Sequence, residues 1–394
     1  MIADILSALL RSNVAMGAAV LAVVLARGPA RRAFGPVAAY GLWAMVPLAG
    51  LAALLPRPVD AVEMTATVLA AAAEAARRSS ARPDVVPDAA LLALWLAGAA
   101  VAATVLLARQ VRFLRALGRL ELGADGALRA ERAGVGPAVV GALRPRIVTP
   151  ADFEARFAPD ERAVILIHEA THLARGDAAI NAVAAGLTCL CWFNPLIHLA
   201  ARWLRVDQEL ACDATVLAQR PAARRLYAET LLKTQLATQA LPLGCHWPAG
   251  GEHPLKARIA MLKAPAPSRR RRLAGLALAG AASLGAACVA WAGQPAATPP
   301  LITLPDWTSR PSGEDIRAAA AAESARVDGM ATIACRVARD GTLADCEVAR
   351  ASSPEIGRVA LALGGRFRMN PTTRDGQSTQ DGVVRIPIRF VTPK

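Results

Sequence analysis

Lysine is nearly absent from this sequence of 394 residues, and tyrosine and phenylalanine are also scarce. The formal net charge of +14 is therefore carried almost wholly by arginine. Direct nucleic-acid binding would require a basic patch combined with aromatic side chains or a recognition helix, and the sequence has no such combination. The arginines instead lie beside apolar segments, which is typical of the edges of membrane spans. The only lysines are Lys233, Lys256, Lys263 and Lys394.

Charged side chains are also missing from four apolar segments of a chain that is 54% hydrophobic overall. The length and composition of these segments predict membrane-spanning helices. A cleaved signal peptide is the alternative for the first segment, but that segment lacks a basic n-region and a clear cleavage site, and a second span follows at once. The predicted spans are Asn13–Ala26, Val37–Leu55, Ala90–Ala108 and Leu273–Ala292.

Arginine at the span edges predicts the orientation, because basic residues favour the cytoplasmic side of a membrane. We therefore place the N-terminus, a loop at 57–89 and residues 293–394 outside, and residues 109–272 in the cytoplasm. This arrangement predicts a multi-pass protein of the bacterial inner membrane. The arginines used are Arg27, Arg31 and Arg32 after the first span, Arg109, Arg112, Arg115 and Arg119 after the third, and Arg269–Arg272 before the fourth.

The stretch "VILIHEATHLARGD" places His168, Glu169 and His172 in the spacing H-E-x-x-H on a predicted helix. Residues four apart share one helix face, so both imidazoles could bind one tetrahedral Zn²⁺. Zinc lowers the pKa of a bound water to about 7, and a neighbouring carboxylate such as that of Glu169 can take its proton. The alternative is a core helix that carries two histidines by chance.

A third zinc ligand is expected downstream, where "LRVDQELACDATVL" contains Glu209 and Asp213 on one face of a second predicted helix. Glu209 could be that ligand, although a solvated surface acid is the alternative. Asp213 could accept a hydrogen bond from the outer nitrogen of a ligating histidine, and Asp177 competes for this role. His253 or Tyr227 could polarise a transition-state oxygen, and the sequence does not rank them.

Two further features surround these motifs. The apolar run Ala178–Leu199 is interrupted at Asn194-Pro195, which predicts a helical hairpin in or against the membrane, with a fifth span as the alternative. His198 is interpreted as a packing or interfacial residue, and His246 as a loop residue. Between 134 and 150 the β-branched and Gly/Pro pattern predicts two short strands.

The C-terminal part of the chain has a different pattern. Residues 293–324 are rich in Pro and Ala, which predicts a linker. Residues 325–394 read as a hairpin with Asp340-Gly341 at its turn, then a helix and a last strand. Cys335 and Cys346 lie five positions on either side of that turn, on the predicted oxidising side, so a disulfide is plausible; a different register or free thiols are the alternatives. The cysteines assigned to the cytoplasmic part are interpreted as reduced.

The motifs "HEATHLARGD", "CWFNPLIHLAARWLRVDQELACDATVL" and "HPLKARIAML" together resemble the integral-membrane zinc peptidases of the beta-lactam-sensor antirepressor family. The resemblance covers roughly residues 1–265. It implies that His168, His172 and Glu209 bind zinc and that Glu169 is the base. It also implies a peptidase that answers an external signal by inactivating a cytoplasmic repressor, directly or through self-cleavage.

The outer domain resembles the C-terminal domain of TonB-type energy transducers, in its D-G hairpin, its helix, "FRMNP" and "VVRIPIRF". Such domains bind partners by strand pairing at a sheet edge; a small sensor or protein-interaction fold is the alternative. A penicillin-sensing domain would carry an acylatable serine in S-x-x-K, and this chain contains no such motif. Covalent sensing of a beta-lactam is therefore not supported.

We predict a mainly α membrane protein with four transmembrane helices, a cytoplasmic gluzincin-like α+β zinc domain over 109–272, and a small periplasmic α+β domain over 325–394. The predicted function is a signalling zinc endopeptidase. Its predicted partners are a cytoplasmic protein substrate, the membrane and a periplasmic protein, and a homodimer is left open. The alternatives are an energy-transducing or envelope-interaction protein with a vestigial peptidase domain, and a transport-coupled receptor without proteolysis.

Overall fold

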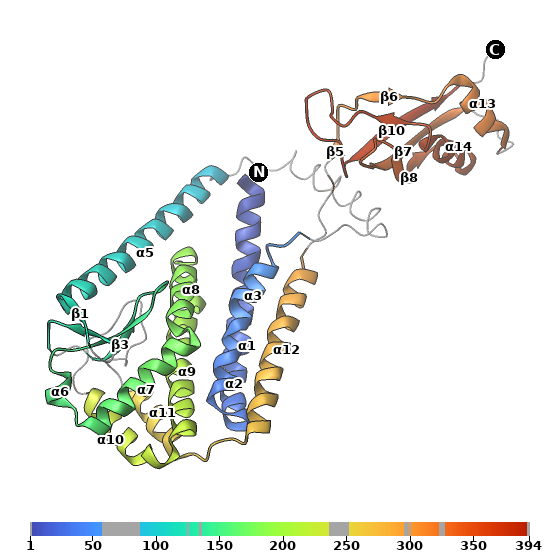
Figure 1. Cartoon of the computed structure of the whole chain (residues 1–394). Helices are drawn as coiled ribbons and strands as arrows, with labels where there is room; N and C mark the ends of the chain where they lie inside the picture. The colour runs from blue at the N-terminus through green and yellow to red at the C-terminus, as the bar shows by residue number, and fades with distance from the viewer. Residues whose placement is uncertain are drawn as a thin grey trace. The chain divides into compact units, whose positions relative to one another are not determined.

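The computed structural model describes residues 2–56, 87–123, 126–133, 136–235, 252–294, 299, 301–322 and 328–391. The chain divides into two compact units (Figure 1). The first unit contains Met1–Leu55 and Asp84–Gln294, and the second is built mainly from Pro295–Lys394. Most of the loop predicted at 57–89 lies outside the described residues.

Within the described residues, three helices are long and apolar enough to cross a membrane: α1 (Ile2–Phe34), α5 (Asp88–Leu117) and α12 (Arg269–Ala292). They contain the first, third and fourth predicted spans. The second predicted span instead folds as α2 (Pro36–Gly41), a 3-10 turn η1 (Leu42–Ala44) and α3 (Met45–Ala52), which together are shorter than the three long helices. The number of four full spans therefore stays a prediction.

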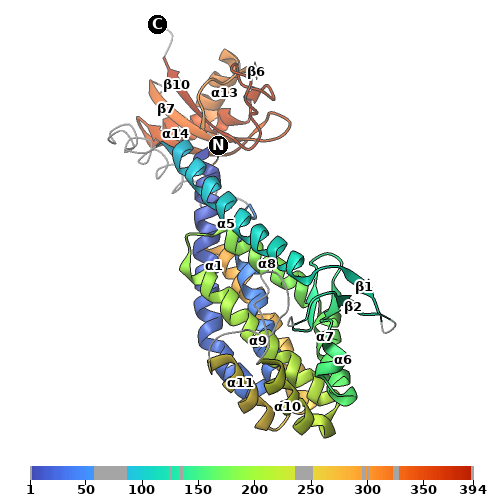
Figure 2. The ribbon, with the colours of Figure 1, turned by 90° about the vertical axis from the view of Figure 1, so that its left-hand side faces the viewer.

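Helices α1, α3 and α12 pack side by side (Figure 1). The chain reverses between α1 and α2 at Gly35. Its φ of 96° is accessible to glycine but unfavourable for other residues, and Pro36 then starts α2. Ser12 donates a hydrogen bond to the carbonyl of Gly50 at 3.0 Å, which ties α1 to α3 in the returning direction. Helix α5 lies beside α8 (Asp177–Leu190) (Figure 2).

A four-stranded sheet follows α5, with strand order β1-β2-β4-β3. Its strands are β1 (Leu120–Leu122), β2 (Leu128–Ala130), β3 (Ala138–Val140) and β4 (Arg146–Thr149). Two of them are the strands predicted between 134 and 150. The other two are additional, and β1 has no buried side chain that would produce an alternating sequence pattern.

The helices that follow the sheet enclose the buried polar centre of the first unit. They are α6 (Phe153–Arg156), α7 (Pro159–Arg175), α8, α9 (Pro195–Gln219), η3 (Pro221–Ala223), α10 (Arg224–Gln235) and α11 (Glu252–Lys263). Helices α8 and α9 form the predicted hairpin: the chain breaks at Asn194, whose side chain accepts a hydrogen bond from the Leu196 N–H at 3.0 Å, and Pro195 begins α9. At 14 residues, α8 is too short to be an ordinary span.

The second unit contains a four-stranded sheet of order β5-β10-β7-β8 and a two-stranded sheet of β6 and β9. Helix α14 packs on β7 and β8. The strands are β5 (Leu301–Ile302), β6 (Trp307–Ser309), β7 (Gly329–Val337), β8 (Leu343–Ala351), β9 (Arg368–Met369) and β10 (Val383–Phe390), and the helices are α13 (Gly313–Ala322) and α14 (Pro354–Gly364).

The prediction of a linker over residues 293–324 was wrong for residues 301–322. Residues 301–322 form β5, β6 and α13, which pair with or pack on β10, β9 and α14. The Pro-rich pattern concealed these elements because the strands have only two and three residues.

Cys335 and Cys346 form a disulfide in the structure. The register shifts between Ala334 and Arg336, because β8 contains a bulge at Asp345, whose φ is 50°. The pairs Ile333↔Val348 and Ala334↔Glu347 keep the predicted register that opposes the two cysteines, and the slipped register begins only at Arg336↔Ala344, nearer the turn.

Candidate metal centre

Helix α7 carries the H-E-x-x-H motif. Pro159 opens the helix, and the Glu161 carboxylate accepts a hydrogen bond from the Ala158 N–H at 2.8 Å. The helix ends at Gly176, whose φ of 69° is left-handed, so α8 can begin at once in a new direction. This turn brings Asp177 back beside His172.

Two imidazole nitrogens and a carboxylate converge where α7 faces α9. The Nε2 atoms of His168 and His172 lie 3.1 Å apart. Glu209 places one carboxylate oxygen 3.5 Å from His168 Nε2 and the other 3.5 Å from His172 Nε2. Glu209 is only 3% exposed and the two histidines are no more than 1% exposed. Glu169, which follows His168, is also buried.

The outer nitrogens of both histidines contact hydrogen-bond partners. His172 Nδ1 lies 2.7 Å from a carboxylate oxygen of Asp177. His168 Nδ1 lies 2.7 Å from the Tyr227 hydroxyl, which donates to Asp213 at 2.6 Å. Asp213 itself is 3.6 Å from His168 Nδ1. The two aspartates considered for one role thus contact different histidines, Asp177 directly and Asp213 mainly through Tyr227.

These contacts determine where the imidazole protons lie. An ionised carboxylate only accepts, so His172 Nδ1 donates to Asp177. The Tyr227 hydroxyl uses its proton on Asp213, so it accepts from His168 Nδ1. Both Nε2 atoms therefore direct their lone pairs toward each other and toward the Glu209 carboxylate.

Three electron-rich groups that face one another, two imidazole nitrogens and one carboxylate, suit a cation. Tetrahedral zinc, with ligands about 2.0–2.1 Å away, separates its ligand atoms by about 3.3 Å, close to the 3.1 and 3.5 Å found here. The neutral imidazole is the form that binds a metal. Burial, assisted by the positive charge of Arg258, lowers the pKa of His168 to about 3. Burial also lowers the pKa of His172.

Arg258 of α11 links the two acidic side chains of α9. Its Nε and Nη2 donate to the two carboxylate oxygens of Asp213 at 2.8 and 2.6 Å, and its Nη1 lies 2.9 Å from Glu209. Burial by itself would raise the pKa of Asp213, but the charge and hydrogen bonds of Arg258 hold that pKa below its usual value. Arg258 therefore favours the ionised form of Asp213 and fixes Glu209 beside the histidines.

Cys212 is an alternative third donor, since His168, His172 and Cys212 offer ligand atoms within 4.8 Å of one another. Its sulfur lies 3.4 Å from His168 Nδ1, the nitrogen that faces away from His172, and 3.4 Å from the His168 carbonyl oxygen. Burial, together with the charge of Glu209, raises the pKa of the thiol well above its usual value. A neutral thiol is a poor zinc ligand, so the geometry favours Glu209.

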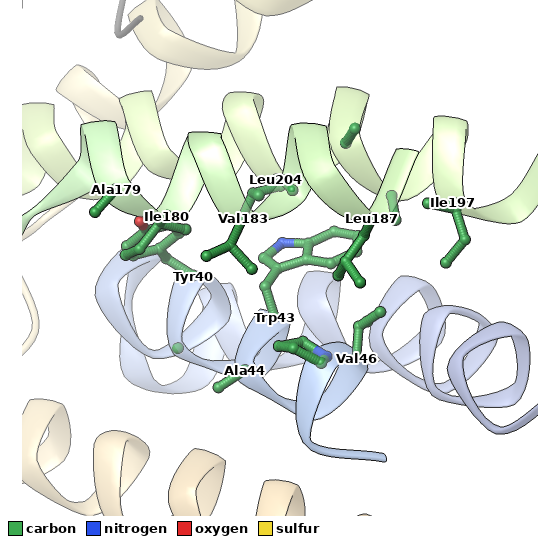
Figure 3. A pocket seen from close by; sticks show the side chains of 15 residues that line it. Tyr40, Trp43, Ala44, Val46, Ala179, Ile180, Val183, Leu187, Ile197 and Leu204 are labelled. Carbon is green, nitrogen blue, oxygen red and sulfur yellow. The ribbon is translucent and has the colours of Figure 1, made fainter. Parts of the chain in front are cut away.

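Membrane helices contact this centre through polar side chains. The Tyr40 hydroxyl of α2 donates to the second carboxylate oxygen of Asp177 at 2.8 Å. Trp43 Nε1 donates to Asp207 at 2.8 Å, and Arg27 of α1 forms an ion pair with Asp207 at 2.8 Å. Tyr40 and Trp43 also line an apolar cavity of about 390 Å³, opposite Val183 and Leu187 of α8 and Ile197 and Leu204 of α9 (Figure 3).

A family model described as BlaR1 peptidase M56 matches residues 7–262, which is more than half of the chain. The chain belongs to the BlaR1 peptidase M56 family. This confirms the resemblance to beta-lactam-sensor antirepressors, and it makes the chain a member of a metallopeptidase family. Together with the long apolar helices, it identifies a multi-pass membrane protein.

Two curated relatives of this M56 chain have related names. It is 35% identical over 98 residues to "Regulatory protein BlaR1" of Bacillus licheniformis, a match covering 25% of this chain and 16% of that protein. It is 25% identical over 144 residues to "Methicillin resistance mecR1 protein" of Staphylococcus aureus, covering 35% of this chain and 25% of that protein. The chain therefore matches a quarter or less of the length of these relatives. Residues 319–392 match the Gram-negative bacterial TonB protein C-terminal family, which confirms the resemblance of the C-terminal domain.

The remaining polar residues considered in the M56 chain lie elsewhere or outside the described residues. His198 is exposed and contacts the Trp192 carbonyl at 2.8 Å, so it is not part of the histidine pair, and its role as a packing or interfacial residue stays a prediction. His246 and the side chain of His253 lie outside the described residues. The sequence reasoning assigned no role to Arg258, although "HPLKARIAML" contains it, and none to Tyr40. Tyr227 was considered as an oxyanion partner, and it instead contacts His168 and Asp213.

Proposed function

We propose that the chain is a membrane-embedded, zinc-dependent endopeptidase that acts in signal transduction. The observation that carries the proposal is the convergence of His168 Nε2, His172 Nε2 and the Glu209 carboxylate within 3.1–3.5 Å of one another. In this proposal these three side chains hold zinc. A zinc ion held there supplies a Lewis acid and lowers the pKa of a coordinated water to about 7.

The protein's own groups hold and move protons. Asp177 and the Tyr227–Asp213 pair keep the Nδ1 protons of the histidines in place, so that both Nε2 atoms stay available as ligands. Glu169 follows a ligand directly on α7, and in the proposed mechanism it accepts a proton from water and returns it to the leaving amine. Arg258 holds Glu209 in position and balances its charge.

The centre is closed in the structure. Glu169 and the three proposed ligands are each 3% exposed or less, so a peptide must displace covering side chains to reach them. This supports an enzyme that is latent until a signal opens it. The contacts of Tyr40 and Trp43 with Asp177 and Asp207 offer a route by which membrane helices could impose that opening.

The proposed substrates are a cytoplasmic regulator, such as a transcriptional repressor, and the chain itself. The names "Regulatory protein" and "Methicillin resistance" of the relatives support this class of role. We further propose the bacterial inner membrane as the location, with the metal centre cytoplasmic and the TonB-like domain periplasmic, on the basis of the arginine distribution. The absence of S-x-x-K separates the proposed signal from covalent beta-lactam sensing.

The decisive comparison is Glu169→Gln against wild type in cells that express a candidate repressor. Zinc content, self-cleavage and repressor loss are measured together. We expect the variant to keep its zinc and to lose both cleavages by at least about 100-fold, which is the usual contribution of a general base. Retained zinc with unchanged cleavage would refute the enzyme proposal.

A second candidate function rests on the TonB-type match of residues 319–392. In this alternative the chain is an energy transducer or envelope-interaction protein, and its peptidase domain is vestigial. Deleting residues 300–394 distinguishes the two roles. A signalling peptidase keeps zinc-dependent cleavage but loses its response to the signal, whereas a transducer loses its only function and shows no cleavage before or after the deletion.

A further inference from the structure

A second cavity of about 610 Å³ lies where the arginine-rich ends of α1 and α12 meet the peptidase helices. It is framed by the end of α1, the start of α2, α9, α10, α11, the segment that joins α11 to α12, and the first turn of α12. It is separate from both the metal centre and the apolar cavity of Figure 3, because the linings have no residue in common.

The lining combines positive charge with apolar surface. No aspartate or glutamate is among the described residues that line the cavity, whereas five arginines are. Phe34, Val37 and Met261 supply part of its apolar wall. The five arginines are Arg31, Arg32, Arg224, Arg271 and Arg272.

Close packing holds the frame of the cavity together. A Cβ added to Gly35 would lie 2.7 Å from Cγ of Pro267, so the α1–α2 turn rests directly on the segment before α12. A Cβ on Gly275 would lie 2.4 Å from Cβ of Phe34, so α12 and α1 also touch. Arg224 Nη1 donates to the carbonyl of Leu262 at 2.9 Å, which fixes α10 to the end of α11. Tightly packed helices therefore hold the walls of the cavity in place.

The expected depth of the cavity in the membrane indicates which kind of ligand it binds. Arg31 and Arg32 end the long apolar helix α1, and Arg271 and Arg272 stand in the first turn of α12, just before its apolar stretch. Arginines at the ends of spanning helices lie at the height of lipid headgroups. Basic pockets between such helices bind anionic headgroups.

We propose that this cavity binds the phosphodiester headgroup of an anionic phospholipid. The arginines bind the phosphate by charge-assisted hydrogen bonds, and the apolar wall contacts the glycerol and the first acyl carbons. Inorganic phosphate would use the charge but not the apolar wall, and therefore fits less well. The inference concerns binding and does not rest on peptidase activity.

A bound headgroup would also touch the helices that build the metal centre. Ala214 of α9 and Ala257 of α11 line the cavity, and they are the neighbours of Asp213 and Arg258 in the chain. Arg31 lies 3.8 Å from Asp207, two residues before Glu209. The lipid would therefore join α1 and α12 to α9, which holds the proposed ligand Glu209, and to α11, which holds Arg258.

Full-length, zinc-loaded protein, delipidated in detergent, is mixed with phosphatidylglycerol or phosphatidylcholine at equal concentration, and retained lipid is counted by native mass spectrometry. We expect preferential retention of phosphatidylglycerol. Arg271→Gln with Arg272→Gln should reduce it on the order of 30-fold, because each arginine near anionic lipid contributes about fivefold. The charge-matched control is Arg269→Gln with Arg270→Gln. These residues begin the same turn of α12 but do not line the cavity, so retention should stay close to that of wild type.

Arg271→Lys with Arg272→Lys should recover most of the retention, and a thermal unfolding curve near that of wild type shows that the Gln pair is folded. Equal loss in the lining pair and the control pair would mean diffuse attraction to the membrane and would overturn the site. Equal retention of the two lipids would do the same. If sodium phosphate alone stabilises wild type against heat as strongly as phosphatidylglycerol does, the cavity is a free-anion site and the lipid assignment is wrong.

Discussion

Tyr40 donates a hydrogen bond to Asp177 at 2.8 Å, across 137 positions of the sequence. The other carboxylate oxygen of Asp177 lies 2.7 Å from His172 Nδ1. A side chain of α2, which lies in the second predicted span, is therefore separated from a proposed zinc ligand by a single carboxylate. Gln208, next to Glu209, also donates to the Tyr40 hydroxyl at 3.0 Å. A movement of α2 would therefore change the contacts of Asp177, which adjoins His172, and of Gln208, which precedes Glu209.

Asp177→Asn should weaken zinc binding by about 10–100-fold, because the outer carboxylate orients a ligating histidine and raises its basicity. The measurement is competition with a calibrated zinc chelator in detergent. Asp207→Asn is the matched control: Asp207 is also fully buried and also contacts membrane helices, but through Arg27 and Trp43. It should lower thermal stability and leave the zinc affinity unchanged. Equal zinc affinities in the two variants would contradict the role of Asp177.

Glu209→Gln and Cys212→Ala decide between the two candidate third ligands. We expect the Glu209 variant to lose zinc under dialysis conditions in which wild type keeps it. An amide oxygen is a weaker ligand than a carboxylate, and the positive charge of Arg258, no longer neutralised by Glu209, then repels the zinc ion. Cys212→Ala should keep stoichiometric zinc and lose only the packing of a small buried side chain. Metal analysis of the dialysed proteins gives the result. Zinc loss on removal of Cys212 alone would assign the third position to the thiol.

Arg258→Met should destabilise the first unit by about 3–5 kcal/mol, since it leaves two buried carboxylates without their shared cation. Thermal unfolding in detergent, followed by circular dichroism, measures the loss. Arg225→Met, one helix away, removes an exposed arginine that pairs with Glu229 at the surface. Its effect on the unfolding temperature should be much smaller, because solvent screens an exposed ion pair. Similar losses in both variants would show that Arg258 does not act through the buried pair.

The arrangement of the candidate site could largely be predicted because its residues lie on two helices at helical spacing. His168 and His172, and likewise Glu209 and Asp213, are four apart, so one face of each helix is fixed by the sequence alone. The contact between the two faces was inferred from the chemistry of zinc ligands. The break between α8 and α9 was equally readable, since Asn194-Pro195 is a strong helix start.

Other parts depend on packing between distant segments, which a single sequence does not encode locally. Arg258 reaches Asp213 across 45 positions, and nothing in its helix distinguishes it from a solvated arginine. The second predicted span has the right composition, but its 3-10 turn at Leu42–Ala44 and its short length follow from how it packs between α1 and α12. Strands β5 and β6 form only because β10 and β9 are present to pair with them.

The disulfide of the C-terminal domain allows a test of the proposed topology that does not depend on peptidase activity. Cys335 and Cys346 close a loop with a sequence separation of 11, and a loop of this size contributes about 3 kcal/mol by restricting the unfolded chain. Cys335→Ser with Cys346→Ser should therefore speed trypsin cleavage of this domain in intact spheroplasts. In wild-type cells trapped with acid, both thiols should resist maleimide labelling until a reductant is added, because disulfides persist on the oxidising side of the membrane. Cys212, on the proposed cytoplasmic side, should label without reductant once the protein is unfolded. Free Cys335 and Cys346 in such cells would place residues 328–391 in the cytoplasm and reverse the proposed orientation.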